Sequence, residues 1–312
     1  MLDFSITRYK VQFQALIAIQ FPDYAGAILR NAFGEALKHL VCHTVHHHGY
    51  CQCDPVERCL YRQLFAPVHR ELKNQQRSID VPPPFIIEAY GLKKLLSVGE
   101  VAQFYMVLIG DLAHQQKKLI EQAWKIALSF GLQQHKKLDI LPQAKLLSFQ
   151  FCDQPQRWLD PQSELQLNII THLRLQYYGQ FLHTKNFDLQ VFCRAVIRRY
   201  LTVVETYSDI NVCSTMLQNI DYQIKKIEGS AALEWLQWSR YNKRQFKSMS
   251  LDGLHGSVQV KNVSDELYYY LYLGQWLHVG KGCVFGLGQY QIVSYPQEHR
   301  TNGFRENLLI EI

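Results

Sequence analysis

Histidines crowd one short stretch in the first quarter of the chain. The segment "HTVHHHGY" at 43–50 holds His43, His46, His47 and His48. Because imidazole has an unperturbed pKa of about 6.5, it can take up or release a proton near neutral pH. The segment therefore predicts general acid or general base catalysis. For any single histidine, two other interpretations stay open: a metal ligand or a solvated loop residue.

Four cysteines flank this segment and fall within 18 residues: Cys42, Cys51, Cys53 and Cys59. Structural zinc sites use four ligands in a tetrahedron and favour sulfur. The spacing, however, is not the paired C-x2-C pattern that indicates zinc most strongly. A structural zinc, four unligated thiols and an iron–sulfur cluster all stay open. The other cysteines are scattered, which is typical of buried small apolar residues: Cys152, Cys193, Cys213 and Cys283.

Four glycines stand close together in "HVGKGCVFGLGQYQIV" at 278–293: Gly280, Gly282, Gly286 and Gly288. The loop leaves a helical pattern and enters a strand-like one, which is the reverse of the phosphate-binding and dinucleotide-binding motifs. Glycine is retained where the backbone needs a positive φ or a close approach. The glycines either cap the helix and form a bulge, or present a flat backbone to a phosphodiester chain with Lys281 as the cation.

The segment "SRYNKRQFKS" at 239–248 interleaves basic and aromatic residues. Its cations are Arg240, Lys243, Arg244 and Lys247. Cations meet phosphates and aromatic rings stack on unpaired bases, so the segment is typical of an RNA-facing strand end. A solvated charged face is the alternative. On a predicted helix, Arg198 could lie along an RNA stem in the same way, although surface helices often carry such residues.

These residues need a scaffold, and hydrophobic periodicity predicts one. In the first half it predicts strands at 5–20, 84–91, 99–110 and 137–151, and helices at 21–41 and 111–130. The order β-α-β-β-α-β is the ferredoxin-like signature. The same order returns after a proline-containing linker at 152–163, with strands at 164–176, 232–242, 253–263 and 289–295, and helices at 188–207 and 265–278. Ser264 is the expected N-cap of the last helix.

The predicted fold class is therefore α+β, with tandem ferredoxin-like (RRM-like) β-α-β-β-α-β domains. We expect an N-terminal domain at 1–152 with a Cys/His-rich insertion at 42–67. The C-terminal domain is expected at 163–312 and carries the glycine-rich loop.

The charge balance fits a polyanionic partner. The 33 Lys and Arg residues exceed the 27 Asp and Glu residues, which leaves a net charge of +6. This mildly basic balance is compatible with nucleic acid binding. The sequence has neither a run of 18 uncharged apolar residues nor the apolar core of a signal peptide. We therefore expect a soluble, cytoplasmic protein with reduced cysteines and no membrane partner.

Three blocks of the sequence resemble a known family. They are "GAILRNAFGEALKHLVC" with "CQCDPVERCLYRQLFAP", "WSRYNKRQFKSMSLDGLHGSV", and "YLYLGQWLHVGKGCVFGLGQY". Together they resemble the RAMP superfamily of CRISPR-associated RNA-binding proteins, and more narrowly the sixth Cas family, which processes pre-crRNA. The resemblance implies a metal-independent endoribonuclease that binds CRISPR repeat RNA, cuts at the base of its stem-loop and leaves a 2′,3′-cyclic phosphate. The crRNA would then guide an effector complex that contains other Cas proteins.

The resemblance also ranks the histidines. The family's catalytic histidine often follows the first helix in a His-x-x-Gly-aromatic pattern, which His46, Gly49 and Tyr50 match. His46 is the first candidate, His43 the second, and His39 on the predicted helix the third. Tyr50 is a candidate hydrogen-bond donor to the developing charge. This chemistry requires no cofactor, and a zinc ion in the cysteine cluster would be structural.

Two other functions fit the same residues. A non-catalytic RAMP subunit that only holds crRNA in an effector complex would share the tandem fold and the glycine-rich loop. A zinc-stabilised protein-interaction module would bind no RNA. The histidine cluster favours the endoribonuclease over both.

Overall fold

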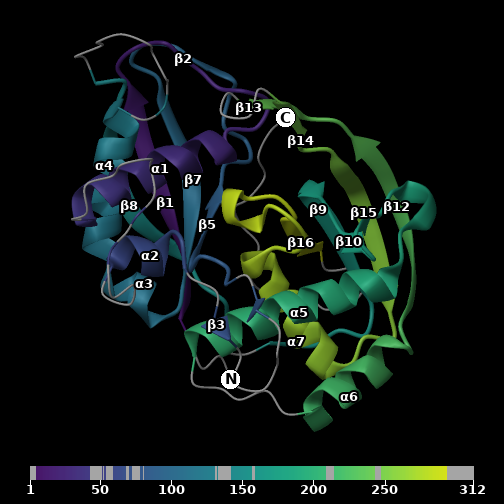
Figure 1. Cartoon of the computed structure of the whole chain (residues 1–312). Helices are drawn as coiled ribbons and strands as arrows, with labels where there is room; N and C mark the ends of the chain where they lie inside the picture. The colour runs from purple at the N-terminus through teal and green to yellow at the C-terminus, as the bar shows by residue number, and fades with distance from the viewer. Residues whose placement is uncertain are drawn as a thin grey trace, which may run out of the picture.

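Two four-stranded antiparallel sheets organise the chain (Figure 1). The computed structural model describes residues 5–42, 51, 53, 59–67, 70–71, 78–79, 81–130, 132, 142–156, 159–208, 214–242 and 247–293. Within these ranges, it describes only the backbone of residues 70–71, 78–79, 214–217, 239–242 and 247–250.

The first sheet comes from the N-terminal half, with the strand order β5-β7-β1-β8. Its strands are β1 (Ile6–Ala15), β5 (Phe85–Glu88), β7 (Val101–Ile109) and β8 (Ala144–Asp153), and its helices are α1 (Gly26–Val41) and α4 (Lys117–Phe130). Along the chain, these elements run β-α-β-β-α-β, with β1 between β7 and β8. This is the ferredoxin-like topology that the sequence predicts.

Buried and partly exposed side chains alternate along β1, and the buried ones lie on the face of the sheet that the helices cover. Val11 and Phe13 are fully buried, whereas Gln12 between them is half-buried on the opposite face. On the covered face, Trp124 of α4 stacks on Phe33 of α1 at a centroid distance of 4.9 Å. Buried aromatic pairs of this kind stabilise the folded state by more than the burial of their surface area alone. The open face is left for polar side chains.

The second sheet repeats the architecture with the strand order β12-β15-β9-β16. Its strands are β9 (Leu165–Leu173), β12 (Glu228–Leu236), β15 (Gly253–Lys261) and β16 (Tyr290–Val293), and its helices are α5 (Leu189–Tyr207) and α7 (Asp265–Leu277). Ser264 Oγ accepts a hydrogen bond from Leu267 N at 3.3 Å, which confirms the expected cap of α7. The fold class is thus α+β with two ferredoxin-like units, as predicted.

Several elements differ from the sequence-based prediction. The helix expected at 111–130 is interrupted at Gln116, which separates α3 (Asp111–Gln115) from α4. The strand expected at 232–242 is instead the end of β12 and a separate short strand, β13 (Ser239–Asn242). Helix α6 (Ser214–Ile224) was not predicted. Its buried Ile220 and Ile224 join the core of the second unit, so tertiary packing stabilises it.

The remaining elements are short. The strands are β2 (Ile19–Gln20), β3 (Arg70–Glu71), β4 (Ser78–Ile79), β6 (Leu95–Leu96), β10 (Gln176–Tyr177), β11 (Gln180–Phe181) and β14 (Lys247–Ser250), and the helices are α2 (Leu60–Leu64), η2 (Thr184–Asn186) and η3 (Cys283–Phe285). Among the described residues, no helix is both long enough and apolar enough to span a membrane.

The two units share their hydrophobic cores. Ile86, Val107 and Ile109 of the first sheet belong to the core formed mainly by the second unit. Conversely, Leu251 and Leu287 from the second half belong to the core of the first. In Figure 1, the yellow-green segment around β16 lies between β5 and β9. The junction between the units is therefore a packed interface.

Candidate functional site

The glycine-rich loop between α7 and β16 has an unusual backbone. Gly280, Gly282, Gly286 and Gly288 all have positive φ, between 70° and 93°. Side-chain-bearing residues rarely adopt this region. His278, which ends α7, also has a positive φ of 55°. The helix is therefore not capped by a glycine as the simplest structural interpretation expects, and the glycines serve the turns that follow.

The loop packs against both units at very short range. A Cβ atom added to Gly286 would lie 2.4 Å from the carbonyl oxygen of Ile87 in β5. On the other side, a Cβ added to Gly26 of α1 would lie 2.1 Å from the carbonyl oxygen of Phe285. Thr171 Oγ1 of β9 donates to Gly286 O at 2.7 Å. The glycines thus allow backbone segments from α1, β5 and β9 to meet at one place.

Burial divides the four glycines into two groups. Gly286 and Gly288, both predicted RNA contacts, are buried. Gly280 and Lys281 are exposed, and Gly282 is half-buried. Only the first part of the loop can therefore present backbone and a cation to a ligand.

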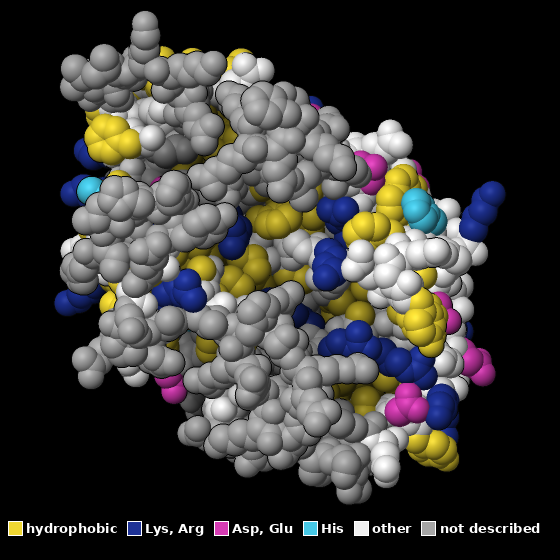
Figure 2. Space-filling model, in the orientation of Figure 1, with side chains coloured by type: hydrophobic (Ala, Val, Ile, Leu, Met, Phe, Trp, Pro, Cys, Tyr) yellow, Lys and Arg dark blue, Asp and Glu magenta, His cyan; other side chains and the backbone are white. Residues whose placement is uncertain are grey.

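Other cations lie near that exposed part. Lys281 N donates to Arg174 O at 2.9 Å, which places Arg174 at the end of β9 beside the loop. Arg199 Nε of α5 donates to Leu277 O at 3.1 Å. Burial raises the pKa of Cys283, and the positive charges of Arg199 and Lys281 oppose that rise, so both cations act on the same loop. Figure 2 shows Lys and Arg side chains gathered over the middle of this face, around the positions of β16 and α5 in Figure 1.

Arg198 is the arginine of α5 that the sequence predicts to contact an RNA stem. Arg198 is exposed, as a stem-contacting residue must be. Its neighbour Arg194 forms an ion pair with Asp221 at 3.1 Å. Arg194 is therefore tied to α6, and Arg199 faces the glycine-rich loop.

A buried ionic network crosses the junction beside the loop. His278 Nε2 lies 3.0 Å from Glu88 Oε1, and His278 Nδ1 lies 3.2 Å from Leu287 O. Arg8 Nε donates to Glu88 Oε2 at 2.8 Å, and Arg8 NH1 donates to Asp153 Oδ2 at 2.9 Å. Glu88 is 3 % exposed and His278 is fully buried. A buried carboxylate needs such partners to stay ionised.

The network also sets the charge state of Glu88. Burial alone would raise the pKa of this carboxyl, but hydrogen bonds and positive charge from His278 and Arg8 outweigh burial and hold the pKa below its ordinary value. In the same way, burial opposes the charge of Arg8, while the carboxylates of Glu88 and Asp153 raise its pKa. Sequence reasoning missed this network because its members are far apart in the chain and show no local pattern.

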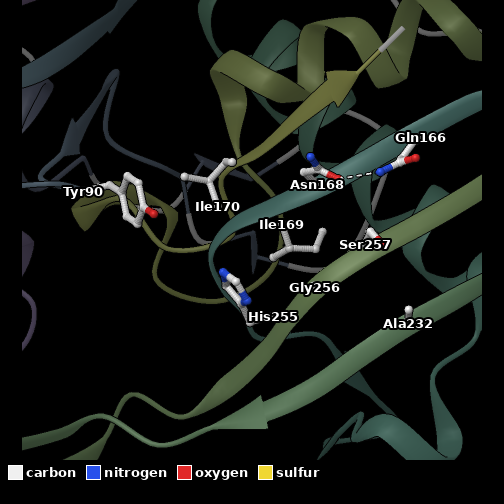
Figure 3. A pocket seen from close by; sticks show the side chains of 9 residues that line it. All are labelled: Tyr90, Gln166, Asn168, Ile169, Ile170, Ala232, His255, Gly256 and Ser257. Atoms are coloured by element: carbon white, nitrogen blue, oxygen red, sulfur yellow. Dashed lines mark hydrogen bonds between the residues drawn. The ribbon is translucent and has the colours of Figure 1, made fainter. Parts of the chain in front are cut away.

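A pocket of about 440 Å³ lies on the open face of the second sheet (Figure 3). Its lining residues come from β9, β12, β15 and the turn after β5: Tyr90, Gln166, Asn168, Ile169, Ile170, Ala232, His255, Gly256 and Ser257. Along β9, Leu165, Leu167 and Ile169 are buried beneath the helices, so the alternate residues point to the pocket side.

The polar groups of this pocket suit an unpaired nucleotide. Gln166 Nε2 donates to Asn168 Oδ1 at 3.1 Å, so the two amides present a fixed set of donors and acceptors. Tyr90, 58 % exposed, reaches the pocket from the first unit. Base edges bind amides, and bases stack on aromatic rings. None of these residues was singled out from the sequence, although the alternation of β9 was the signal that could have found them.

The four clustered cysteines come together in space. Their Sγ atoms all lie within 4.8 Å of one another. Cys42 follows α1 directly, and Cys59 precedes α2. Of the scattered cysteines, Cys193 and Cys283 are buried as expected, Cys152 is exposed, contrary to expectation, and Cys213 lies outside the described residues.

The structure separates the third-ranked histidine from the glycine-rich loop. His39 is exposed in the last turn of α1, whereas Gly26, which contacts the loop, begins that helix. Thirteen residues of helix at about 1.5 Å each correspond to ~20 Å. His39 therefore lies at the opposite end of α1 from the residue that contacts Phe285 of the loop.

Some predicted site residues lie outside the residues that the structure describes, and of others it describes only the backbone. His43, His46 and Tyr50 of the histidine segment, and Lys243 and Arg244 of the basic segment, are outside the described residues. Arg240 lies on β13 and Lys247 on β14, which pair in an antiparallel hairpin with Asn242 opposite Lys247. Of Arg240 and Lys247, only the backbone is described.

Comparisons with known families match both halves of the chain. The profile of a family described as CRISPR-associated endoribonuclease Cas6 matches residues 167–290. A second profile, described as an N-terminal domain, matches residues 4–148. No curated protein sequence matches the chain.

Solved structures share the fold over nearly the whole chain. A Cas6 product complex aligns with a TM-score of 0.55 and 11 % identity, covering 93 % of this chain and 100 % of that one. Cas6 from Thermus thermophilus aligns with a TM-score of 0.53 and 10 % identity, covering 93 % and 99 %. A partial Cas6-RT-Cas1–Cas2 complex aligns with a TM-score of 0.53 and 12 % identity, covering 96 % of this chain and 48 % of that one.

Proposed function

We propose that the chain, whose residues 167–290 match the profile of CRISPR-associated Cas6 endoribonucleases, binds CRISPR repeat RNA and cleaves precursor transcripts into crRNA. The observation that supports this most directly is the exposed part of the glycine-rich loop inside the matched residues. There, Gly280 and Lys281 meet Arg174 at the junction of the two units. Phosphate contacts require exposed cations, and the exposed Lys281 supplies one.

In this proposal, the RNA backbone lies along the Lys and Arg side chains, and one of its nucleotides enters the pocket. Lys281, with Arg174 and Arg199 beside it, contacts phosphates at the junction, and Arg198 contacts the stem along α5. Lys243 and Arg244, with Arg240 and Lys247, add cations between β13 and β14. An unpaired nucleotide occupies the pocket between Tyr90 and Asn168. Electrostatic contacts to phosphate supply affinity, and contacts to the base edge supply sequence preference.

Cleavage proceeds without a metal ion. The 2′-hydroxyl oxygen of the nucleotide before the cut attacks the phosphorus, forming the 2′-oxygen–phosphorus bond while the bond from phosphorus to the 5′-oxygen breaks. A general base takes the 2′-hydroxyl proton, and a general acid gives a proton to the 5′-oxygen. The products are a 2′,3′-cyclic phosphate and a 5′-hydroxyl. His46 is our first candidate for proton transfer, with His43 next and His39 third, and Tyr50 donates to the developing charge.

The ~20 Å between His39 and the start of α1 constrains this arrangement. If His39 carries out the cleavage, Lys281 contacts a phosphate other than the one that is cut. The bound RNA must then extend along α1. We therefore assign Lys281 to positioning of the RNA, and not to the reacting phosphate.

Other Cas proteins are the expected partners. The partial Cas6-RT-Cas1–Cas2 complex contains a part that shares this fold. We propose that the chain passes its crRNA to an effector complex, in which other Cas proteins contact the product RNA. Cytoplasmic location follows from that role.

A cleavage assay tests the proposed function. A labelled CRISPR repeat RNA is incubated with the chain in EDTA, beside the same RNA with one 2′-deoxynucleotide before the cut. We expect cleavage of the first RNA, a cyclic phosphate at its new 3′ end, and no cleavage of the second. Tight binding without cleavage of either RNA would instead indicate a non-catalytic RAMP subunit. Failure to bind repeat RNA would contradict both functions.

A further inference from the structure

We propose that Cys42, Cys51, Cys53 and Cys59 bind one structural Zn²⁺ ion. This site lies outside the cleavage chemistry, which needs no metal. The four residues offer four sulfur ligands, the set that structural zinc favours. Within the part of the chain that the structure describes, these four cysteines are the group of metal-ligating side chains close enough to share an ion.

The sulfur positions fit a single tetrahedral ion. With Zn–S bonds of about 2.3 Å, neighbouring sulfurs in a tetrahedron stand ~3.8 Å apart. The distances are 3.3 Å from Cys42 Sγ to Cys51 Sγ, 3.5 Å from Cys42 Sγ to Cys53 Sγ, and 3.5 Å from Cys51 Sγ to Cys59 Sγ. All six pairs lie within 4.8 Å. A small inward or outward adjustment of each side chain would centre one ion among them.

Two other arrangements of these sulfurs fit less well. A disulfide would bring two sulfurs to about 2.05 Å and leave the other two without a partner. The four Sγ atoms instead form one group, and their distances of 3.3 to 3.5 Å are well beyond the length of a disulfide bond. An iron–sulfur cluster places several iron and sulfide atoms between its cysteine ligands, which therefore stand farther apart than around one ion. The compact spacing favours a mononuclear site.

The surroundings indicate a structural rather than a catalytic ion. Cys51 and Cys59 are buried, and Cys42 and Cys53 are half-buried. With four protein ligands, the ion keeps no open position for water or substrate. The site is therefore closed to substrate chemistry.

The ion would join the end of α1 to the start of α2. Cys42 is the residue after α1, and Cys59 is the residue before α2. Helix α2 has only five residues, too few to be stable alone. Its buried Leu64 anchors it to the first core. Zinc would fix the other end of α2 to α1, so that metal binding and local folding are coupled.

Metal analysis of the purified full chain tests the proposal. We expect one zinc per chain after expression in zinc-supplemented medium. Replacement with Co²⁺ should give the intense sulfur-to-cobalt charge-transfer absorption and the visible bands of a tetrahedral thiolate site. Cys51→Ser and Cys59→Ser should each lose most of the bound metal. Cys152→Ser is the matched control, because Cys152 is exposed and outside the cluster, and it should keep one zinc.

The proposal stays testable if the serine variants do not fold. A mercurial reagent titrated into the folded unmodified chain should release one zinc as four thiols react, detected with a zinc-binding dye. Absence of zinc together with absence of the cobalt bands would overturn the site. Stoichiometric iron in place of zinc would also overturn it. Because these readouts do not involve RNA, a chain that binds zinc and fails to cut repeat RNA would contradict the proposed function alone.

Discussion

His278 Nε2 lies 3.0 Å from Glu88 Oε1, and this buried contact joins residues 190 positions apart in the chain. Glu88 ends β5 of the first unit, and His278 follows α7 of the second. Arg8 completes the neutralisation of the carboxylate from β1. The glycine-rich loop starts immediately after His278. The same contact therefore joins the two units beside the loop that we propose for RNA binding.

Replacing this carboxylate should destabilise the protein in a pH-dependent way. Glu88→Gln removes the buried carboxylate that is the counter-charge of Arg8, which we expect to lower the free energy of unfolding by about 3 to 5 kcal/mol at pH 7. The folded-state pKa of Glu88 lies below its ordinary value. Its stabilisation is therefore fully present above the unfolded pKa of about 4.3, and it is lost as the pH falls through the folded pKa.

Denaturant unfolding at a series of pH values measures this effect. The unmodified chain should lose stability below about pH 4.3, and Glu88→Gln should show a shallower loss over the same range. Glu100→Gln is the control, because the ion pair of Glu100 with the exposed Lys93 lies at the surface and a glutamine can still accept the hydrogen bond from Ser97 N, so stability should change little. Equal pH slopes for Glu88→Gln and the unmodified chain would refute the role of the ionised carboxylate.

Alanine at Gly286 should disrupt the junction of the units. The residue has a φ of 93°, and an added Cβ would lie 2.4 Å from Ile87 O. Gly179 has a similar φ of 80°, but a Cβ there would meet nothing within 4 Å. Gly179→Ala should therefore cost only the backbone strain, about 1 to 2 kcal/mol, while Gly286→Ala adds a steric cost of about 1 to 3 kcal/mol.

Thermal unfolding of the two glycine variants separates these costs. We expect Gly286→Ala to lower Tm clearly more than Gly179→Ala does. If both variants unfold at the same temperature, the close approach of the loop to β5 does not contribute to stability.

Substitution of the first-ranked histidine should abolish cleavage and leave binding intact. His46→Ala removes a proton-transfer group whose contribution is typically a factor of about 10² to 10⁴ in rate. The affinity for repeat RNA should stay the same, since the charge of the RNA-binding surface is unchanged. His47→Ala and His48→Ala are the matched controls from the same segment, and each should cut at nearly the normal rate. Single-turnover cleavage and filter binding measure the two properties, and an unimpaired His46→Ala would show that the assignment is wrong.

The pocket on the second sheet should bind an unpaired part of the repeat. Tyr90→Ala removes the aromatic ring, and stacking of one base contributes about 1 to 3 kcal/mol, so affinity should fall about 5-fold to 150-fold. Tyr222 on α6 is 59 % exposed, close to the 58 % of Tyr90, and provides a control of equal exposure away from the pocket. Fluorescence anisotropy with a single-stranded fragment of the repeat measures both variants. A similar affinity for Tyr90→Ala and Tyr222→Ala would exclude the pocket as a base-binding site.

Local patterns predicted some of the elements of this chain but not all of them. The alternation in β1 and the serine before α7 predicted a strand and a helix start that the structure confirms, because strand alternation and N-capping act over a few residues. The break at Gln116 and the helix α6 were not predicted. Ile220 and Ile224 stabilise α6 by packing against core residues that are far away in the sequence, and a local sequence pattern does not indicate such contacts.

By itself, the sequence determined that two β-α-β-β-α-β units follow one another, that four cysteines stand near a histidine segment, and that one loop is rich in glycine. Only the tertiary structure decided which glycines are buried, that Glu88 meets His278, and that Tyr90 faces Asn168 across a pocket. The physical reason is the separation in sequence over which each interaction acts. Periodicity and capping depend on neighbours in the chain, whereas burial, ion pairing and pocket shape depend on how the two units pack, which brings together residues that are far apart in sequence.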